Sequence, residues 1–215
     1  MKNVLLASAV ALAVFLIPVA QSSPSAQAAA QAPADPNAWT IDTSHSAATF
    51  GVRHLMVSTV RGTLGPVNGT IWYDGKSVSS VRADVVIDVT GINTANDGRD
   101  THLKSADFFD VPNHPTITFK SKRVTAGPAG AFKLIGDLTM RGTTKEVTLD
   151  VEAPAATITQ PGRNGGPATY RTGTTATTTV NRFDYGLKWN NLMADSNAVV
   201  SSDVRVTLDL ELTKR

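Results

Sequence analysis

A strict alternation of apolar and polar residues between Ser79 and Thr90 is the strongest structural constraint in this chain of 215 residues. One face of this stretch is apolar and the other carries charges and hydroxyls, with only Val86 out of pattern. Successive side chains of a strand point to opposite faces, so this pattern predicts a strand in an antiparallel sheet with one wet face. The apolar face is formed by Val81, Ala83, Val85, Ile87 and Val89.

The same period of two recurs along the rest of the chain, between turn clusters rich in Gly, Pro and Asn. The further expected strands are Trp39–Asp42, Ser46–Arg53, Thr59–Leu64, Thr70–Tyr73, Thr116–Val124, Ala131–Met140, Glu146–Glu152, Thr169–Asn181 and Asp203–Thr213. Because no alternation of strands with helices is seen, the prediction is an all-β fold of about eight to ten antiparallel strands. A barrel and a two-sheet sandwich both fit. The long, one-faced final stretch favours the barrel, because closure removes an exposed edge.

One segment interrupts the strands with a helix-sized insert. Residues 97–106 are polar and lack proline, and Asn96 or Asp97 can serve as the N-cap of a short surface helix. Pro112 and Pro115 then end any helix. We expect this insert to act as a lid at an open end of the β structure and to bound its main cavity.

Composition excludes several classes of function. The 20 Lys and Arg balance 18 Asp and Glu without a run of like charge, so no nucleic-acid partner is expected. The absence of Cys excludes disulfides, thiol catalysis and thiolate metal sites. The four histidines have no helical ligand spacing, so we expect no metal site, although one assembled in space is left open. No GxSxG, P-loop or GxGxxG motif occurs.

The N-terminus has the three regions of a secretory signal peptide. A positive Met1–Asn3 precedes the apolar run Val4–Val19, and Ala26–Ala28 fits the small-x-small cleavage rule, with cleavage after Ala28 or Ala30. The run is shorter than the roughly 20 residues of a membrane span, although an uncleaved anchor is left open. We expect a signal peptide over 1–28, a flexible tail over 29–38, one domain over 39–215, and a periplasmic or secreted location.

The faces predicted to point inward mix large and small side chains. Small residues (Ala48, Ala83 and Gly136) lie among them, so the interior is either a packed core or an unfilled pore, and Gly136 marks a bulge, a bend or extra room. Composition alone leaves both readings open. The candidates for lining a pore are Phe50, Val52, Met56, Phe108, Phe109, Phe119, Phe132, Leu134, Leu138 and Met140.

Six motifs in order, spanning residues 39–213, resemble the YceI-like family of bacterial lipid-binding proteins: WTIDTSHSAATFGVRH, RDTHLKSADFFD, HPTITFKS, GDLTMRGTTKEVTLDV, NRFDYG and VTLDLEL. The resemblance implies an extended, lipocalin-like antiparallel barrel in the periplasm or outside the cell. It also implies a polyisoprenoid or isoprenoid quinone held in the pore by the ten candidates above. The segment Leu192–Ser202 and the loop near Arg163 depart most from the family pattern, which bears on ligand length and on the pore entrance.

Three functions follow. The first is binding of a long apolar lipid for carriage or sequestration without chemistry, with no cofactor beyond a bound isoprenoid lipid or quinone; Arg99 and His102 would then contact its head group. The second is an enzyme that acts on a lipid or small polar substrate with Arg99, His102 and Asp107. The third is a structural or interaction domain with a solid core.

Arg182 and Asp184 are expected to form a structural pair near the barrel rim. A transient membrane contact and a homodimer are left open.

Overall fold

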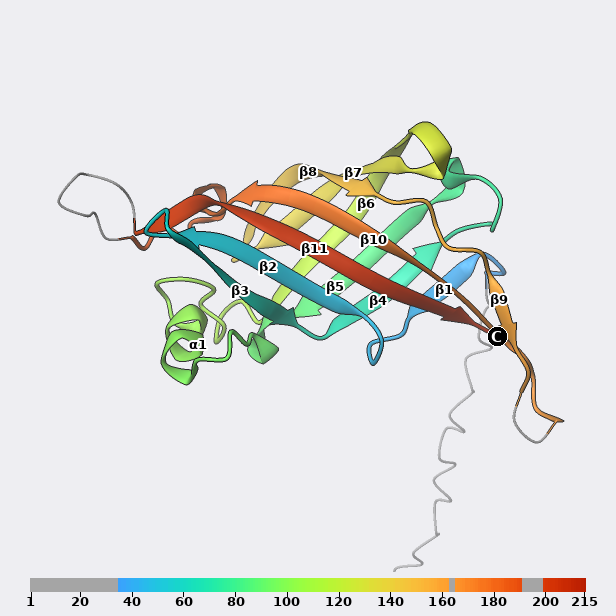
Figure 1. Cartoon of the computed structure of the whole chain (residues 1–215), viewed down its shortest axis with the longest axis horizontal. Coiled ribbons are helices and arrows are strands. Elements are labelled where there is room, and N and C mark those ends of the chain that lie inside the picture. Colours follow the sequence, from blue (N-terminus) through green and yellow to red (C-terminus); the bar gives the residue numbers. More distant parts are fainter. Residues whose placement is uncertain (1–34, 163–164, 191–198) are drawn as a thin grey trace, which may run out of the picture. The chain divides into compact units, whose positions relative to one another are not determined.

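The computed structural model describes residues 35–162, 165–190 and 199–215, which form an antiparallel β-barrel (Figure 1). The predicted signal peptide and most of the predicted tail lie outside the described residues, as does most of Leu192–Ser202. Within the described part, no helix is long and apolar enough to cross a membrane. Its strands are β1 Ala38–Ile41, β2 Ala47–His54, β3 Ser58–Gly65, β4 Val67–Trp72, β5 Arg82–Asp88, β6 Thr116–Ala126, β7 Phe132–Met140, β8 Thr143–Val151, β9 Ile158–Gln160, β10 Thr169–Asn181 and β11 Val200–Lys214.

Eight of these strands close into a ring in the order β11-β1-β4-β5-β6-β7-β8-β10. The ring closes because β10 and β11 pair over twelve positions, from Tyr170↔Lys214 to Asn181↔Asp203. The hairpin β2–β3 extends the sheet, since β2 pairs with the first part of β11, while β1 pairs with its end. The predicted barrel is confirmed, and the sandwich alternative is wrong. The long strand β11 has partners on both sides. It therefore has no exposed edge, as the sequence analysis expected of a closed barrel.

The inward faces follow the alternation in the sequence. In β5, Ala83, Val85 and Ile87 are buried and the residues between them are more exposed. Residue 136 sits where the β6–β7 pairing shifts between Ser121 and Arg123, so of the three alternatives for Gly136 the structure has a bulge, in the paired strand β6. A Cβ at Gly136 would lie 2.7 Å from Phe119 Cζ, so only glycine lets the two strands approach this closely.

The predicted helical insert is the helix α1, Asp97–Lys104. It begins after Asn96, whose side chain accepts a hydrogen bond from the Arg99 backbone N–H at 2.9 Å. The polar side chains of the helix are not all exposed to solvent. Asp100 is buried and accepts a hydrogen bond from the Thr94 backbone N–H at 2.9 Å. Leu103 packs against the core, so this anchor holds α1 beside one end of the barrel (Figure 1).

Candidate ligand cavity

The barrel encloses a cavity of about 680 Å³ whose wall is almost entirely apolar. Nine of the ten predicted pore residues line it: Phe50, Val52, Phe108, Phe109, Phe119, Phe132, Leu134, Leu138 and Met140. The site prediction omitted the aliphatic half of the wall, although the alternation pattern signals it. That half is supplied by β5, β8, β10 and β11 through Ala83, Val85, Ile87, Leu149, Val151, Ala176, Val180, Val204, Val206, Leu208, Leu210 and Leu212.

The tenth predicted pore residue, Met56, does not line the cavity. Strand β2 ends at His54, and the chain then reverses through Leu55 and Met56, which both have positive φ angles of 51° and 56°. This turn ends the alternation of the strand, so Met56 points away from the interior and is 55% exposed. His54 and Ser58, on either side of the turn, are the residues that contact the cavity.

The cavity reaches the surface at the end that carries α1. Among the lining residues in ranges 35–162, 165–190 and 199–215, only Ser58 at the start of β3 and Gly98 in the first turn of α1 are exposed; the rest are buried or half-buried. Arg99, His102 and Leu103 of α1 also line the cavity here. The helix therefore bounds the cavity, as the sequence predicted, and we call the opening between Ser58 and Gly98 the mouth.

Both predicted head-group residues line the cavity at this end, although their polar atoms have different partners. Arg99 donates from Nε to Thr94 Oγ1 at 2.7 Å and from Nη2 to the Thr94 carbonyl at 2.8 Å. His102 Nε2 lies 2.9 Å from Asp107 Oδ2, and its ring packs edge-on against Phe108 and Trp189. Arg99 thus points to Thr94 rather than to the His102–Asp107 pair, so the three residues proposed for an enzyme do not converge on one point.

Arg182 is a functional candidate that sequence reasoning assigned a different role. Its side chain lines the cavity, is 4% exposed, and donates to four backbone carbonyls, those of Leu187, Trp189, Val200 and Ser201, at 2.5–3.1 Å. Among the described residues it has no carboxylate within ion-pair distance, so the predicted pair with Asp184 is wrong. The short helix Arg182–Tyr185 leaves Asp184 exposed on the outside. Burial lowers the pKa of the Arg182 guanidinium, because carbonyl dipoles only partly replace water.

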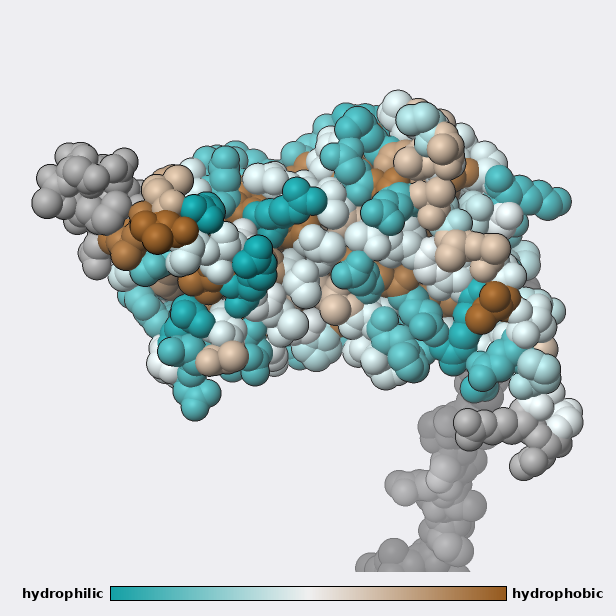
Figure 2. Space-filling view, viewed as in Figure 1, coloured by the Kyte–Doolittle hydropathy of each residue, from teal (hydrophilic) through white to brown (hydrophobic). Residues whose placement is uncertain are grey.

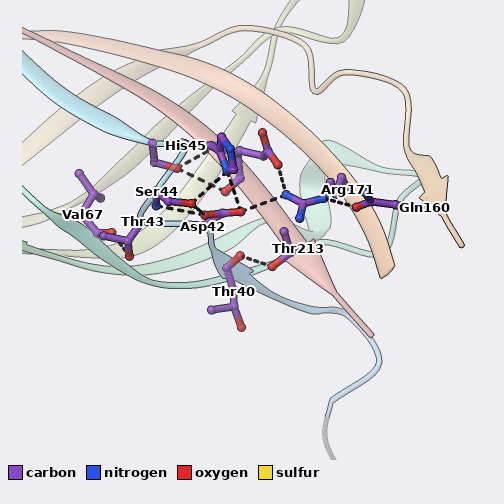
Figure 3. A network of polar contacts seen from close by, with 11 residues as sticks. Thr40, Asp42, Thr43, Ser44, His45, Val67, Gln160, Arg171 and Thr213 are labelled. Atoms are coloured by element: carbon purple, nitrogen blue, oxygen red, sulfur yellow. Dashed lines mark hydrogen bonds and ion pairs between the residues drawn. The ribbon is translucent and has the colours of Figure 1, made fainter. Parts of the chain in front are cut away.

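A second polar network lies where β1, β10 and β11 meet (Figure 3). Arg171 Nη1 lies 3.0 Å from Asp42 Oδ2 and also contacts Glu211, while His45 Nδ1 lies 3.0 Å from Asp42 Oδ2. Hydrogen bonds from the Ser44 hydroxyl, His45 and Arg171 hold the pKa of Asp42 well below its usual range. Asp42, His45 and Glu211 have the spacing of metal ligands, but the Arg171 guanidinium already donates a hydrogen bond to each of the two carboxylates. We therefore interpret this network as a clasp that joins the strands.

Comparison with known proteins identifies the family. The model of the YceI-like domain matches residues 39–212, from Trp39 in β1 to Leu212 in β11. The chain belongs to the YceI-like family. A UPF0312 protein of Staphylococcus aureus (strain bovine RF122 / ET3-1) is 35% identical over 175 residues, which cover 81% of this chain and 96% of that protein. The YceI-like match therefore covers the whole barrel.

Solved structures share the YceI-like barrel. The YCEI protein of Campylobacter jejuni is 27% identical, with a TM-score of 0.60 over 76% of this chain and 90% of that one. BcnA of Burkholderia cenocepacia has a TM-score of 0.65 at 17% identity, covering 81% and 99%. A polyisoprenoid binding domain from Saccharophagus degradans has a TM-score of 0.55 at 18% identity, covering 82% and 98%. The last two likenesses show the fold alone.

Proposed function

We propose that this protein binds a long apolar lipid of the isoprenoid class in the barrel cavity, holds it outside the cytoplasm and releases it unchanged. The observation that carries the proposal is the cavity of about 680 Å³, which a solid-core domain would not leave unfilled. Protein interiors are close-packed, and ligand pockets typically measure about 300–1,000 Å³. The cavity therefore has the size and the apolar wall of a binding site.

The energetics favour a long ligand. Burying ten carbons contributes roughly 8 kcal/mol at about 0.8 kcal/mol per methylene. Association removes at least about 4 kcal/mol of that gain, which leaves at most about 4 kcal/mol, or binding no tighter than about millimolar, at this length. Each further isoprenoid unit adds apolar contact at a smaller ordering cost, so affinity is expected to rise with chain length until the cavity is full.

The polar end of the cavity supports one orientation of the ligand. Polar side chains gather toward the mouth, where His54, Arg99, His102 and Arg182 line the wall. Arg182 uses four of its five N–H groups on carbonyls, so one Nη2 hydrogen has no partner among the described residues. A phosphate or quinone oxygen at this end would accept that hydrogen bond while the apolar tail fills the barrel.

Binding without chemistry is favoured over the enzyme alternative by the arrangement at the mouth. Arg99 is held by Thr94, which separates it from His102 and Asp107. Support for the ligand class also comes from the polyisoprenoid binding domain of Saccharophagus degradans, which has the same fold. The predicted signal peptide supports a role outside the cytoplasm.

The test is extraction of the purified chain with organic solvent, followed by mass spectrometry, on two matched variants. Ala176 lines the cavity, so Ala176→Phe is expected to fill the space and to abolish the co-purified isoprenoid. Thr177 lies on the opposite face of the same strand, so Thr177→Phe is the control that keeps the ligand. A wild-type extract free of lipid from several hosts would reject the proposal. Conversion of an added isoprenoid to a product of different mass would favour the enzyme alternative instead.

A further inference from the structure

The turn between β2 and β3 exposes three consecutive apolar side chains to solvent. Leu55, Met56 and Val57 are 37%, 55% and 81% exposed, and we call them the apolar tip. Scattered apolar residues on a surface need no explanation, but three in a row at the end of a projecting hairpin form a patch. Figure 2 shows hydrophobic surface gathered at this end of the molecule.

The apolar tip adjoins the mouth of the cavity. His54 precedes it and Ser58 follows it, and both residues line the cavity. Ser58 is one of the two exposed lining residues, within the part of the chain that the structure describes, that define the mouth. An apolar ligand that enters or leaves between Ser58 and Gly98 therefore passes beside the tip.

The conformation of the tip is held against its own backbone preference. Leu55 and Met56 have positive φ angles, which is uncommon for residues other than glycine and costs free energy. Arg53 compensates, since it donates from Nη2 to the Met56 carbonyl at 2.6 Å and from Nη1 to Thr59 Oγ1 at 3.1 Å. These hydrogen bonds fix the turn so that its apolar side chains face outward.

A basic groove runs from the tip along the outer face of the barrel. Arg61, Gly51 and Arg205 are paired in a row across β3, β2 and β11, and glycine leaves the two guanidinium groups unshielded. With Arg53 they line a surface groove in which Asp203 is the one carboxylate among the described residues. Neither Arg61 nor Arg205 has a carboxylate within ion-pair distance in the part of the chain that the structure describes. The groove therefore carries an excess of positive charge.

We propose that the apolar tip and this basic groove form a docking surface for a bilayer containing anionic phospholipid. The apolar side chains enter the boundary between head groups and acyl chains, and the arginines contact lipid phosphates. A bilayer offers both chemistries, an apolar boundary for the tip and a layer of phosphates for the arginines. The inference rests on the proposed function, because docking places the mouth of the cavity against the medium in which an isoprenoid is dissolved.

The test is flotation of the purified chain with phosphatidylcholine vesicles, with and without phosphatidylglycerol, at low and high salt. Wild type should float with the anionic vesicles and less at high salt. The tip variant Met56→Ser/Val57→Ser should lose roughly tenfold or more of its vesicle partitioning, because it removes buried apolar area. Arg61→Gln/Arg205→Gln should abolish the preference for anionic vesicles and the salt dependence. Ile158→Ser is the control, since Ile158 is 61% exposed on β9 and does not line the cavity.

Retention of the isoprenoid, measured on the same samples after delivery from detergent, separates this inference from the proposed function. Loss of flotation with full retention in the tip variant supports docking. Wild type that retains the lipid but ignores all vesicles overturns docking and leaves lipid binding intact. Vesicle binding without lipid retention in wild type would overturn the proposed function alone. The tip could instead pack against a second copy of the chain. Docking would be overturned if wild type is a dimer that does not bind vesicles and the tip variant is a monomer.

Discussion

The hydroxyl of Tyr185 is buried without a hydrogen-bond partner among the described residues. Its side chain is 2% exposed, and burial, with Asp184 nearby, raises the pKa of Tyr185 to about 12. An unsatisfied buried polar group costs about 1–3 kcal/mol, so Tyr185→Phe is expected to increase the free energy of unfolding by roughly 1 kcal/mol. Urea denaturation measures this change in the free energy of unfolding. Tyr170→Phe, at a residue 38% exposed, should change stability little, and a clear loss in Tyr185→Phe would show that the hydroxyl has a partner.

Asp42 makes stability depend on acid pH. Because the Ser44 hydroxyl, His45 and Arg171 depress its pKa in the folded state, Asp42 stabilises the fold fully above its unfolded pKa of about 4. That contribution is lost as pH falls through 4 toward the lower folded pKa. Asp42→Asn should therefore lower stability at pH 7 and reduce the loss between about pH 5 and pH 2.

Urea denaturation at a series of pH values measures this effect. Asp88 is the comparison, since its pKa is also lowered, but by a local hydrogen bond from the Thr90 side chain and then by the Thr90 backbone N–H. Asp88→Asn should also reduce the loss of stability at acid pH, but it should leave the hydrogen bonds of the clasp around Arg171 intact. If the stability of Asp42→Asn falls with acid pH as steeply as that of wild type, Asp42 is not the group responsible for this pH dependence.

At the level of elements, the turn between β7 and β8 anchors two segments at the mouth end. Arg141 and Gly142 both have positive φ angles, and the Arg141 guanidinium donates to the Ala106 carbonyl at 2.6 Å and to the Gly186 carbonyl. Charged hydrogen bonds of this kind contribute about 1.5–3 kcal/mol each before solvent screening. Arg141→Ala is therefore expected to lower the free energy of unfolding by roughly 2 kcal/mol.

Chemical denaturation checks this prediction, and hydrogen exchange locates the effect. Amide protection should fall around Ala106 and Gly186, which lie 35 and 45 residues from Arg141 in the sequence. Lys133→Ala, which removes an exposed ion pair with Asp150 elsewhere on β7, should cost less than about 1 kcal/mol. Equal effects of the two variants would mean that the Arg141 contacts contribute nothing beyond a surface charge.

Sequence reasoning succeeded where local pattern decides structure. The strands β5 and β11 and the helix α1 follow from alternation and capping, and the sequence named Asn96 as one of two possible caps and a bulge as one of three explanations for Gly136. It failed where partners are distant. Strand β9 lies inside a loop rich in Gly and Pro and is specified only by its pairing with Thr169–Arg171. The contacts of Arg182 depend on carbonyls beyond its own turn, which no local pattern reveals.

At the scale of the molecule, closure of the barrel and emptiness of its interior are linked. The pairing of β10 with β11 satisfies the last free edge of the ring, so the sheet does not depend on a filled core to hide its backbone groups. Large side chains from β6 and β7 face aliphatic ones from β11 across the cavity without filling it. A barrel built this way can retain its fold whether or not a ligand is present, as a carrier requires.

Removal of the ligand should therefore lower stability without unfolding the chain. A ligand that binds only the folded state adds about 2.7 kcal/mol at a concentration one hundred times its Kd, which corresponds to about 5–10 °C in Tm for a chain of this size. We expect delipidated wild type to melt at lower temperature and added isoprenoid alcohol to restore the loss, as followed by circular dichroism. Ala176→Phe, which fills the same cavity, should melt at one temperature with or without the lipid. Identical melting of loaded and delipidated wild type would mean that the lipid is not held inside the barrel, because burial of its chain in this cavity must favour the folded state.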